Sequence, residues 1–196
     1  MNKIEDYKKE MLTIDLLKAN LYGMFAIIPI LFIYGVPFYL LWRNSLSKVA
    51  LKSFINEFDS GIWGNFIFIL LAITIGTILH ELIHGITWAK YTKNGFKSIK
   101  FGVLWKMLTP YCHCVEPLKV KQYILGAIMP AIILGFLPFA YSLFTGNVLC
   151  LFFGVFFTMA STGDFLIINL LLKEKKDDFV LDHPSEAGCY IYRKEE

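Results

Sequence analysis

The chain has 196 residues, of which 56% are hydrophobic and only 18% are charged, and its mean hydropathy is +0.55. An ordinary soluble domain is about 45–50% apolar and about 25% charged, so this composition excludes a typical soluble domain and indicates a membrane protein. The net charge of +3 is too small to indicate nucleic-acid binding, and the sequence contains no nucleic-acid motif. The N-terminus lacks a short apolar core followed by a cleavage site of small residues, so we expect no removable signal peptide.

Residues 1–20 mix lysines and carboxylates with apolar side chains that recur at three- and four-residue steps. This spacing predicts an amphipathic helix that lies on the membrane surface before the first apolar run. A frayed polar tail is the alternative interpretation of the same segment.

Four apolar segments follow, and each is long enough to cross a hydrocarbon core about 30 Å thick as a helix. They are residues 21–42, 65–89, 123–144 and 148–172. Pro29 and Pro37 predict a kink in the first of them. The segments between and after them are polar: residues 43–60, the loop 90–122, the tight turn 145–147 and the tail 173–196. We therefore expect residues 1–196 to form one all-α polytopic membrane domain.

The basic residues predict how this domain is oriented. Of the 19 Lys and Arg residues, 16 lie in segments 1–20, 90–122 and 173–196, and the other three lie in residues 43–60. Because cytoplasmic segments of membrane proteins are enriched in Lys and Arg, we expect a multi-pass protein of the cell membrane with both termini in the cytosol. The four cysteines are then expected to be free thiols.

The second apolar segment contains His80-Glu81-Leu82-Ile83-His84. Two histidines four residues apart lie on one face of a helix and can bind one zinc ion, and the glutamate after the first can act as a general base on water. Three ionisable side chains inside a segment suited to hydrocarbon mark a functional site by default. Histidines that only hydrogen-bond to their neighbours are the structural alternative.

Catalytic zinc usually takes three protein ligands, so a third ligand is required. The candidates are Asp164, His113, His183, Cys112 and Cys114. By helix rise, His84 and His80 lie about 9 Å and about 15 Å from the end of their segment at Lys90, and Asp164 lies about 13.5 Å from the end of its segment at Lys173. These depths match, and Asp164 is the only charge in its apolar segment, so it is the predicted third ligand.

With these residues the chain resembles the site-2 protease group of intramembrane zinc proteases. It is more similar to a bacterial family described as putative zincin peptidases, which shares the pattern at His80–Gly85, the pair Gly163-Asp164 and a tail like residues 182–188. The resemblance covers roughly residues 65–190, and it implies that His80, His84 and Asp164 bind zinc and that Glu81 is the catalytic base. The site-2 group often has Asp-Gly in place of Gly-Asp, with an upstream Asn and Pro that this chain lacks.

The loop and the tail are expected to contribute short strands at the cytosolic mouth of the site. Residues 96–116 predict a β-hairpin, which we interpret as a surface that holds an extended substrate by strand addition. A plain connecting loop is the alternative. His113 is a candidate residue for contact with substrate at this mouth, and residues 189–193 predict a strand that pairs with the hairpin.

These features together predict an intramembrane zinc metalloprotease that hydrolyses transmembrane or membrane-proximal peptides, with a membrane protein or peptide as substrate and the lipid bilayer as its surroundings. The residues leave open a non-proteolytic zinc-binding scaffold or partner-binding protein, which would bind zinc without turnover. A metal transporter is a further alternative, although the polar residues concentrate in the cytosolic half and do not line a complete path.

Overall fold

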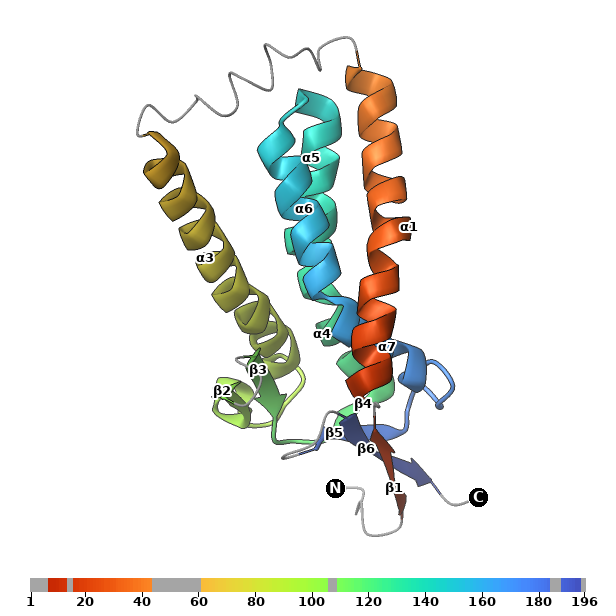
Figure 1. The fold of residues 1–196 in the computed structure, drawn as a ribbon. Coiled ribbons are helices and arrows are strands. Elements are labelled where there is room, and N and C mark those ends of the chain that lie inside the picture. The colour runs from red at the N-terminus through yellow and green to blue at the C-terminus, as the bar shows by residue number, and fades with distance from the viewer. Residues whose placement is uncertain (1–6, 14–15, 44–60, 106–108, 184–187, 195–196) are drawn as a thin grey trace.

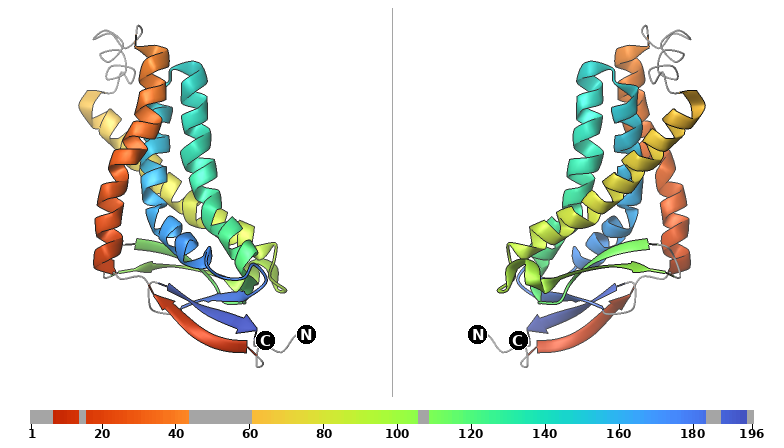
Figure 2. Two further views of the ribbon diagram at one scale, coloured as in Figure 1. Left: turned by 90° about the vertical axis from the view of Figure 1, so that its right-hand side faces the viewer. Right: turned by 90° about the vertical axis from the view of Figure 1, so that its left-hand side faces the viewer.

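A computed structural model describes residues 7–13, 16–43, 61–105, 109–183 and 188–194 (Figure 1). The predicted polar connection 43–60 lies outside the described residues apart from Arg43, as do residues 184–187 of the tail. The described parts form a bundle of long helices with short strands gathered at one end (Figures 1 and 2).

The helices correspond closely to the four predicted apolar segments. They are α1 (Leu16–Trp42), α3 (Gly61–Ala89), the continuous series α4 (Val120–Pro130), η3 (Ala131–Phe136) and α5 (Leu137–Thr145), and the pair α6 (Val148–Ala160) and α7 (Thr162–Leu171). Three spans are long and apolar enough to cross a membrane, and α6 with α7 makes a fourth if the bent pair is one span. The structure is therefore compatible with a membrane protein of three to four spans.

Large apolar side chains face outward along most of α1 and α3. Phe32 of α1 is 68% exposed, and Trp63 and Phe66 of α3 are 75% and 59% exposed. Water would penalise such a surface, whereas lipid chains solvate it at no cost, so the exposed rows support spans that face hydrocarbon.

The fourth predicted apolar segment forms a bent pair of helices. It bends by 46° between α6 and α7, at Ser161. The Ser161 hydroxyl donates to the Phe157 carbonyl at 3.0 Å, and the Thr162 hydroxyl donates to the Met159 carbonyl at 2.6 Å. Hydroxyls that bond back to the preceding turn bend helices, and the bend puts Asp164 in the first turn of α7.

The strands form two antiparallel sheets, which are more extensive than the small hairpin or strand element predicted beside the helices. One sheet has four strands in the order β1 (Tyr7–Thr13), β6 (Gly188–Lys194), β5 (Phe179–Asp182) and β4 (Leu118–Lys119). The other pairs β2 (Ile99–Leu104), which follows the short helix η2 (Gly95–Ser98), with β3 (Thr109–Cys114). The hairpin predicted within residues 96–116 is confirmed, and so is the strand predicted at residues 189–193. The predicted pairing between them was wrong, because β6 pairs with β1 and β5.

The predicted N-terminal amphipathic helix was also wrong over residues 7–13, which form strand β1. Here β1 pairs antiparallel with β6 from the far end of the chain, and Arg193 of β6 forms an ion pair with Glu10. The ammonium of Lys9 lies 3.6 Å from the centre of the Tyr190 ring. Pairing with a neighbouring strand decides the secondary structure of such a short polar segment, so the local spacing of its apolar residues is a weak guide.

Both sheets, the start of α1 and the ends of α3 and α7 lie at the same end of the bundle (Figures 1 and 2). This agrees with placing segments 1–20, 90–122 and 173–196 on one side, and the assignment of that side to the cytosol stays a prediction. The larger apolar core also lies at this end. It joins the last turns of α3, helices α4 and α7 and both sheets through residues that include Trp88, Tyr123, Leu171 and Val180.

Candidate metal centre

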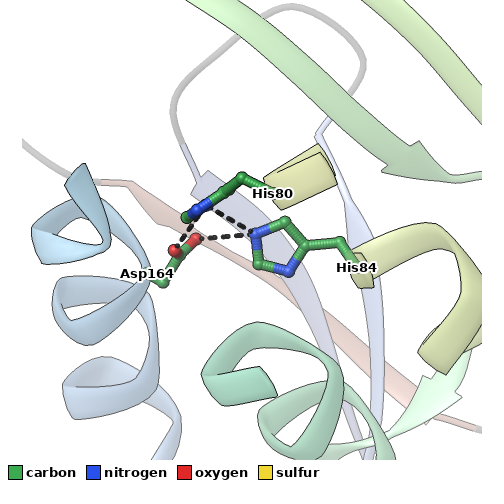
Figure 3. Close-up of side chains that lie close together, drawn as sticks. All are labelled: His80, His84 and Asp164. Carbon is green, nitrogen blue, oxygen red and sulfur yellow. Dashed lines mark hydrogen bonds and ion pairs between the residues drawn. The ribbon is translucent and has the colours of Figure 1, made fainter. Parts of the chain in front are cut away.

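Helix α3 directs His80 and His84 toward the same point, as their spacing predicts. The two side chains are one helical turn apart, and their Nε2 atoms lie 3.2 Å from each other. Both residues are buried, with 7% and 4% of their surfaces exposed. A pair of imidazole nitrogens therefore converges on one small volume inside the protein (Figure 3).

Asp164 of α7 completes this cluster from the opposite side. Its Oδ2 lies 3.2 Å from Nε2 of His80, and its Oδ1 lies 3.3 Å from Nε2 of His84 (Figure 3). The ligand atoms of His80, His84 and Asp164 all lie within 4.8 Å of one another, so the three residues could hold a metal ion. The structure thus brings Asp164, the third ligand predicted from its depth, together with His80 and His84.

His84 is oriented by contacts on its other side. Its Nδ1 lies 2.9 Å from the carbonyl oxygen of Gly126 in α4, so this nitrogen carries the proton and Nε2 keeps a lone pair. The indole of Trp88 stacks on the His84 ring at a centroid distance of 5.1 Å and an angle of 14°. Metal-binding histidines are usually held by such a second hydrogen bond to a carbonyl or carboxylate.

The unsatisfied polar atoms indicate that the cluster suits a cation. Nδ1 of His80 and Oδ2 of Asp164 are buried without a hydrogen-bond partner among the described residues, although Oδ2 is within 3.2 Å of His80 Nε2. Buried polar atoms without partners are costly, and one cation between the two Nε2 atoms and the carboxylate would satisfy Oδ2 of Asp164. Two nitrogen ligands and one oxygen ligand fit zinc, with a position left open.

Glu81 lies beside the cluster but does not belong to it. It interacts electrostatically with His80, His84 and Asp164, and the backbone of Cys112 in β3 forms a hydrogen bond with its carboxylate. Gly85 explains how the hairpin comes so close, because a Cβ at this position would lie 2.7 Å from Phe101 and 3.0 Å from Ile99 of β2. The glycine after His84 therefore lets the hairpin pack directly on α3.

The other candidate ligands lie outside the cluster within the described part of the chain. The His113 ring lies 6.5 Å from the Tyr111 ring between centroids, and the His183 ring packs against Tyr190 at 4.8 Å. The Cys114 thiol donates to the Glu116 carbonyl, and burial raises the pKa of this thiol to about 11. This hydrogen bond and the position of the thiol outside the cluster give Cys114 no role as a ligand in the described structure.

Sequence reasoning missed the residues that surround the cluster, namely Trp88, Tyr123, Gly126 and Asp182. Trp88 and Gly126 lie in apolar segments where nothing in the local pattern separates them from lipid-facing neighbours. The sequence contained one signal for Asp182, because this residue begins the stretch 182–188 that is among the features resembling the zincin family.

Gly126→Ala should distort the support of His84. A Cβ at this position would lie 2.0 Å from Nε1 of Trp88, so the indole or α4 must move. We expect the substitution to lower the free energy of unfolding by about 1–3 kcal/mol and to weaken metal binding. Thermal melting and metal titration would measure both effects. Gly35→Ala is the matched control, because a Cβ there meets nothing within 4 Å, and an equal effect of both substitutions would contradict the packing argument.

The fold and the cluster define a mainly helical protein with membrane-length apolar helices and a buried His–His–carboxylate site able to hold a metal ion. In a comparison with protein families, the family described as "Putative zincin peptidase" matches residues 73–179, more than half of the chain. The chain belongs to this family, which suggests a metallopeptidase and implies zinc as the metal. The match contains His80, Glu81, His84 and Asp164. No curated protein matches the chain, and no solved structure does.

Proposed function

We propose that the chain is an intramembrane zinc metalloprotease that hydrolyses peptide bonds in transmembrane or membrane-proximal segments. The observation that carries the proposal is the convergence of His80, His84 and Asp164 between two apolar helices, with Glu81 next to them. The family supports the peptidase chemistry, and the long apolar helices support a location within the membrane. The arrangement is the one expected for a protease related to the site-2 group.

In this proposal His80, His84 and Asp164 hold zinc, which when bound supplies a Lewis acid that polarises the scissile carbonyl and acidifies water. Glu81 accepts the proton of the attacking water and later delivers it to the leaving amine. Its carboxylate is suited to this role because it interacts electrostatically with all three residues of the cluster without being one of the converging ligands. Trp88 stacks on His84 and is itself stacked on Tyr123, and this packing keeps the ligand from turning during the reaction.

The hairpin is proposed to present the substrate as an extended strand. Strand β3 reaches Glu81 through the backbone of Cys112. A peptide that bonds to this edge at Cys112, next to the Cys114 N–H that Asp182 holds, would therefore lie beside the base. A substrate carbonyl that takes over the Cys112 N–H would at the same time release Glu81 toward the attacking water. His113, on the same strand, is a candidate for contact with the substrate in this arrangement.

The proposal is tested with the full chain in lipid vesicles, together with a panel of transmembrane peptides whose products are analysed by mass spectrometry. We expect cleavage that is lost when the metal is removed with a chelator and that returns when zinc is added, because in this proposal zinc is the group that acidifies the attacking water. Zinc binding without cleavage of any peptide would favour the scaffold alternative. Zinc flux across the vesicle membrane without cleavage would favour a transporter.

A further inference from the structure

Asp182, the last residue of β5, is a buried carboxylate that the proposed mechanism does not use. Only 9% of its surface is exposed, and burial raises the pKa of its carboxyl group. Its Oδ1 accepts a hydrogen bond from the Tyr123 hydroxyl in α4, and its Oδ2 accepts one from the backbone N–H of Cys114 in β3 at 2.7 Å. A buried carboxylate is costly, and here it joins β5 to α4 and β3, through partners that lie 59 and 68 residues away in the sequence.

The hydrogen bond between Asp182 and Tyr123 connects Asp182 to His84 through a chain of aromatic contacts. The Tyr123 ring stacks on Trp88 at a centroid distance of 4.9 Å, and the Tyr123 carbonyl accepts from Nε1 of Trp88 at 3.0 Å. Trp88 in turn stacks on His84. Asp182 therefore holds the aromatic pair that supports one face of the His84 ring.

The hydrogen bond between the Cys114 N–H and Asp182 connects Asp182 to Glu81 through strand β3. The Val115 N–H donates to the Ser98 carbonyl, and the register pairs Ile99 with Cys114 and Phe101 with Cys112. Because antiparallel pairs alternate between bonded and non-bonded, the backbone groups of Cys112 and Cys114 both point away from β2, along the outer edge of β3. Asp182 holds the Cys114 N–H on this edge, and Glu81 is bonded to the backbone of Cys112 two residues earlier.

We propose that Asp182 is a positioning residue for the candidate metal centre, which orients His84 through Tyr123 and Trp88 and places β3 against Glu81 through Cys114. The effect on peptide cleavage rests on the proposed function. The effects on metal binding and on the position of β3 do not, so the test uses these two measurements.

The test compares Asp182→Ala, Asp182→Asn and Tyr123→Phe in the full chain purified in detergent. One measurement is zinc affinity, and the other is the alkylation rate of Cys112, with Cys150 in the first turn of α6 as internal reference. We expect Asp182→Ala to lower zinc affinity by about 10–100-fold and to speed Cys112 alkylation by about tenfold. Asp182→Asn should restore part of both losses, because its amide can still bond to both partners.

Tyr123→Phe separates a positioning role from a merely structural one. It removes only the hydrogen bond from Tyr123 to Asp182, which supports Trp88 and His84. Zinc affinity should therefore fall while the alkylation rate of Cys112 stays at the wild-type value. Asp177→Asn is the matched control, since this exposed carboxylate binds only Lys119 and Lys121 among the described residues, and it should change neither measurement. If Asp182→Ala does not fold, Asp182→Asn and Tyr123→Phe decide the question.

Wild-type zinc affinity and wild-type Cys112 alkylation in a folded Asp182→Ala chain would overturn the inference. So would equal changes of both measurements in Tyr123→Phe, because a general loss of stability moves them together. A wild-type chain that binds zinc and cleaves no peptide would contradict the proposed protease, and these two measurements would still decide the role of Asp182.

Discussion

Replacing Glu81 with glutamine should reduce peptide cleavage by about 10²–10⁴-fold and leave zinc binding unchanged. Glutamine has nearly the same shape and keeps an oxygen that can bond to the backbone of Cys112, but it cannot accept a proton from water. Zinc binding should persist because Glu81 is not one of the three converging residues. Cleavage rates and zinc content per chain, measured on the same preparation, would show this separation.

The matched control for this experiment is Glu174→Gln. Glu174 lies at the same end of the bundle and accepts two hydrogen bonds from Arg193, one of which glutamine can still accept. This variant should cleave peptides at close to the wild-type rate. Cleavage by a verified Glu81→Gln chain at an undiminished rate would rule out Glu81 as the base, and loss of zinc from that variant would place Glu81 among the ligands.

Replacing Asp164 with alanine should abolish the stabilisation of the fold by zinc. An ion that binds only the folded state stabilises it by about 2.7 kcal/mol when its free concentration is 100 times Kd. The wild-type chain should therefore melt at a higher temperature when zinc is added. Without the Asp164 carboxylate, two neutral imidazoles remain and the ion loses its only anionic ligand in the cluster, so the melting temperature should no longer respond.

Thermal melting with and without zinc measures this effect, and zinc content of the same samples provides a second reading. Asp177→Asn also removes one carboxylate, but from an exposed pair of contacts with Lys119 and Lys121, and it should keep the full zinc response. An Asp164→Ala chain that zinc stabilises as much as the wild type would show that the third ligand is another residue.

The candidate site could be predicted from the sequence because its components depend on local or simple geometric properties. The spacing of His80 and His84 fixes their common face on any helix. Asp164 could be matched to them by its depth. When two helices cross the same layer in the same direction, residues at equal distances from the helix ends lie at the same level of that layer. The four apolar segments were equally predictable, since the thickness of the hydrocarbon sets their length.

Only the tertiary structure revealed the parts that depend on partners from distant segments. Strand β1 exists because β6 pairs with it from the other end of the chain, and the local spacing of residues 7–13 indicated a helix instead. The contacts that orient His84 come from α4, and the carboxylate that connects them to the hairpin comes from β5. Apolar patterning specifies which segments are long and apolar enough to span a membrane. The hydrogen bonds that position a ligand form only between elements that folding has already brought together.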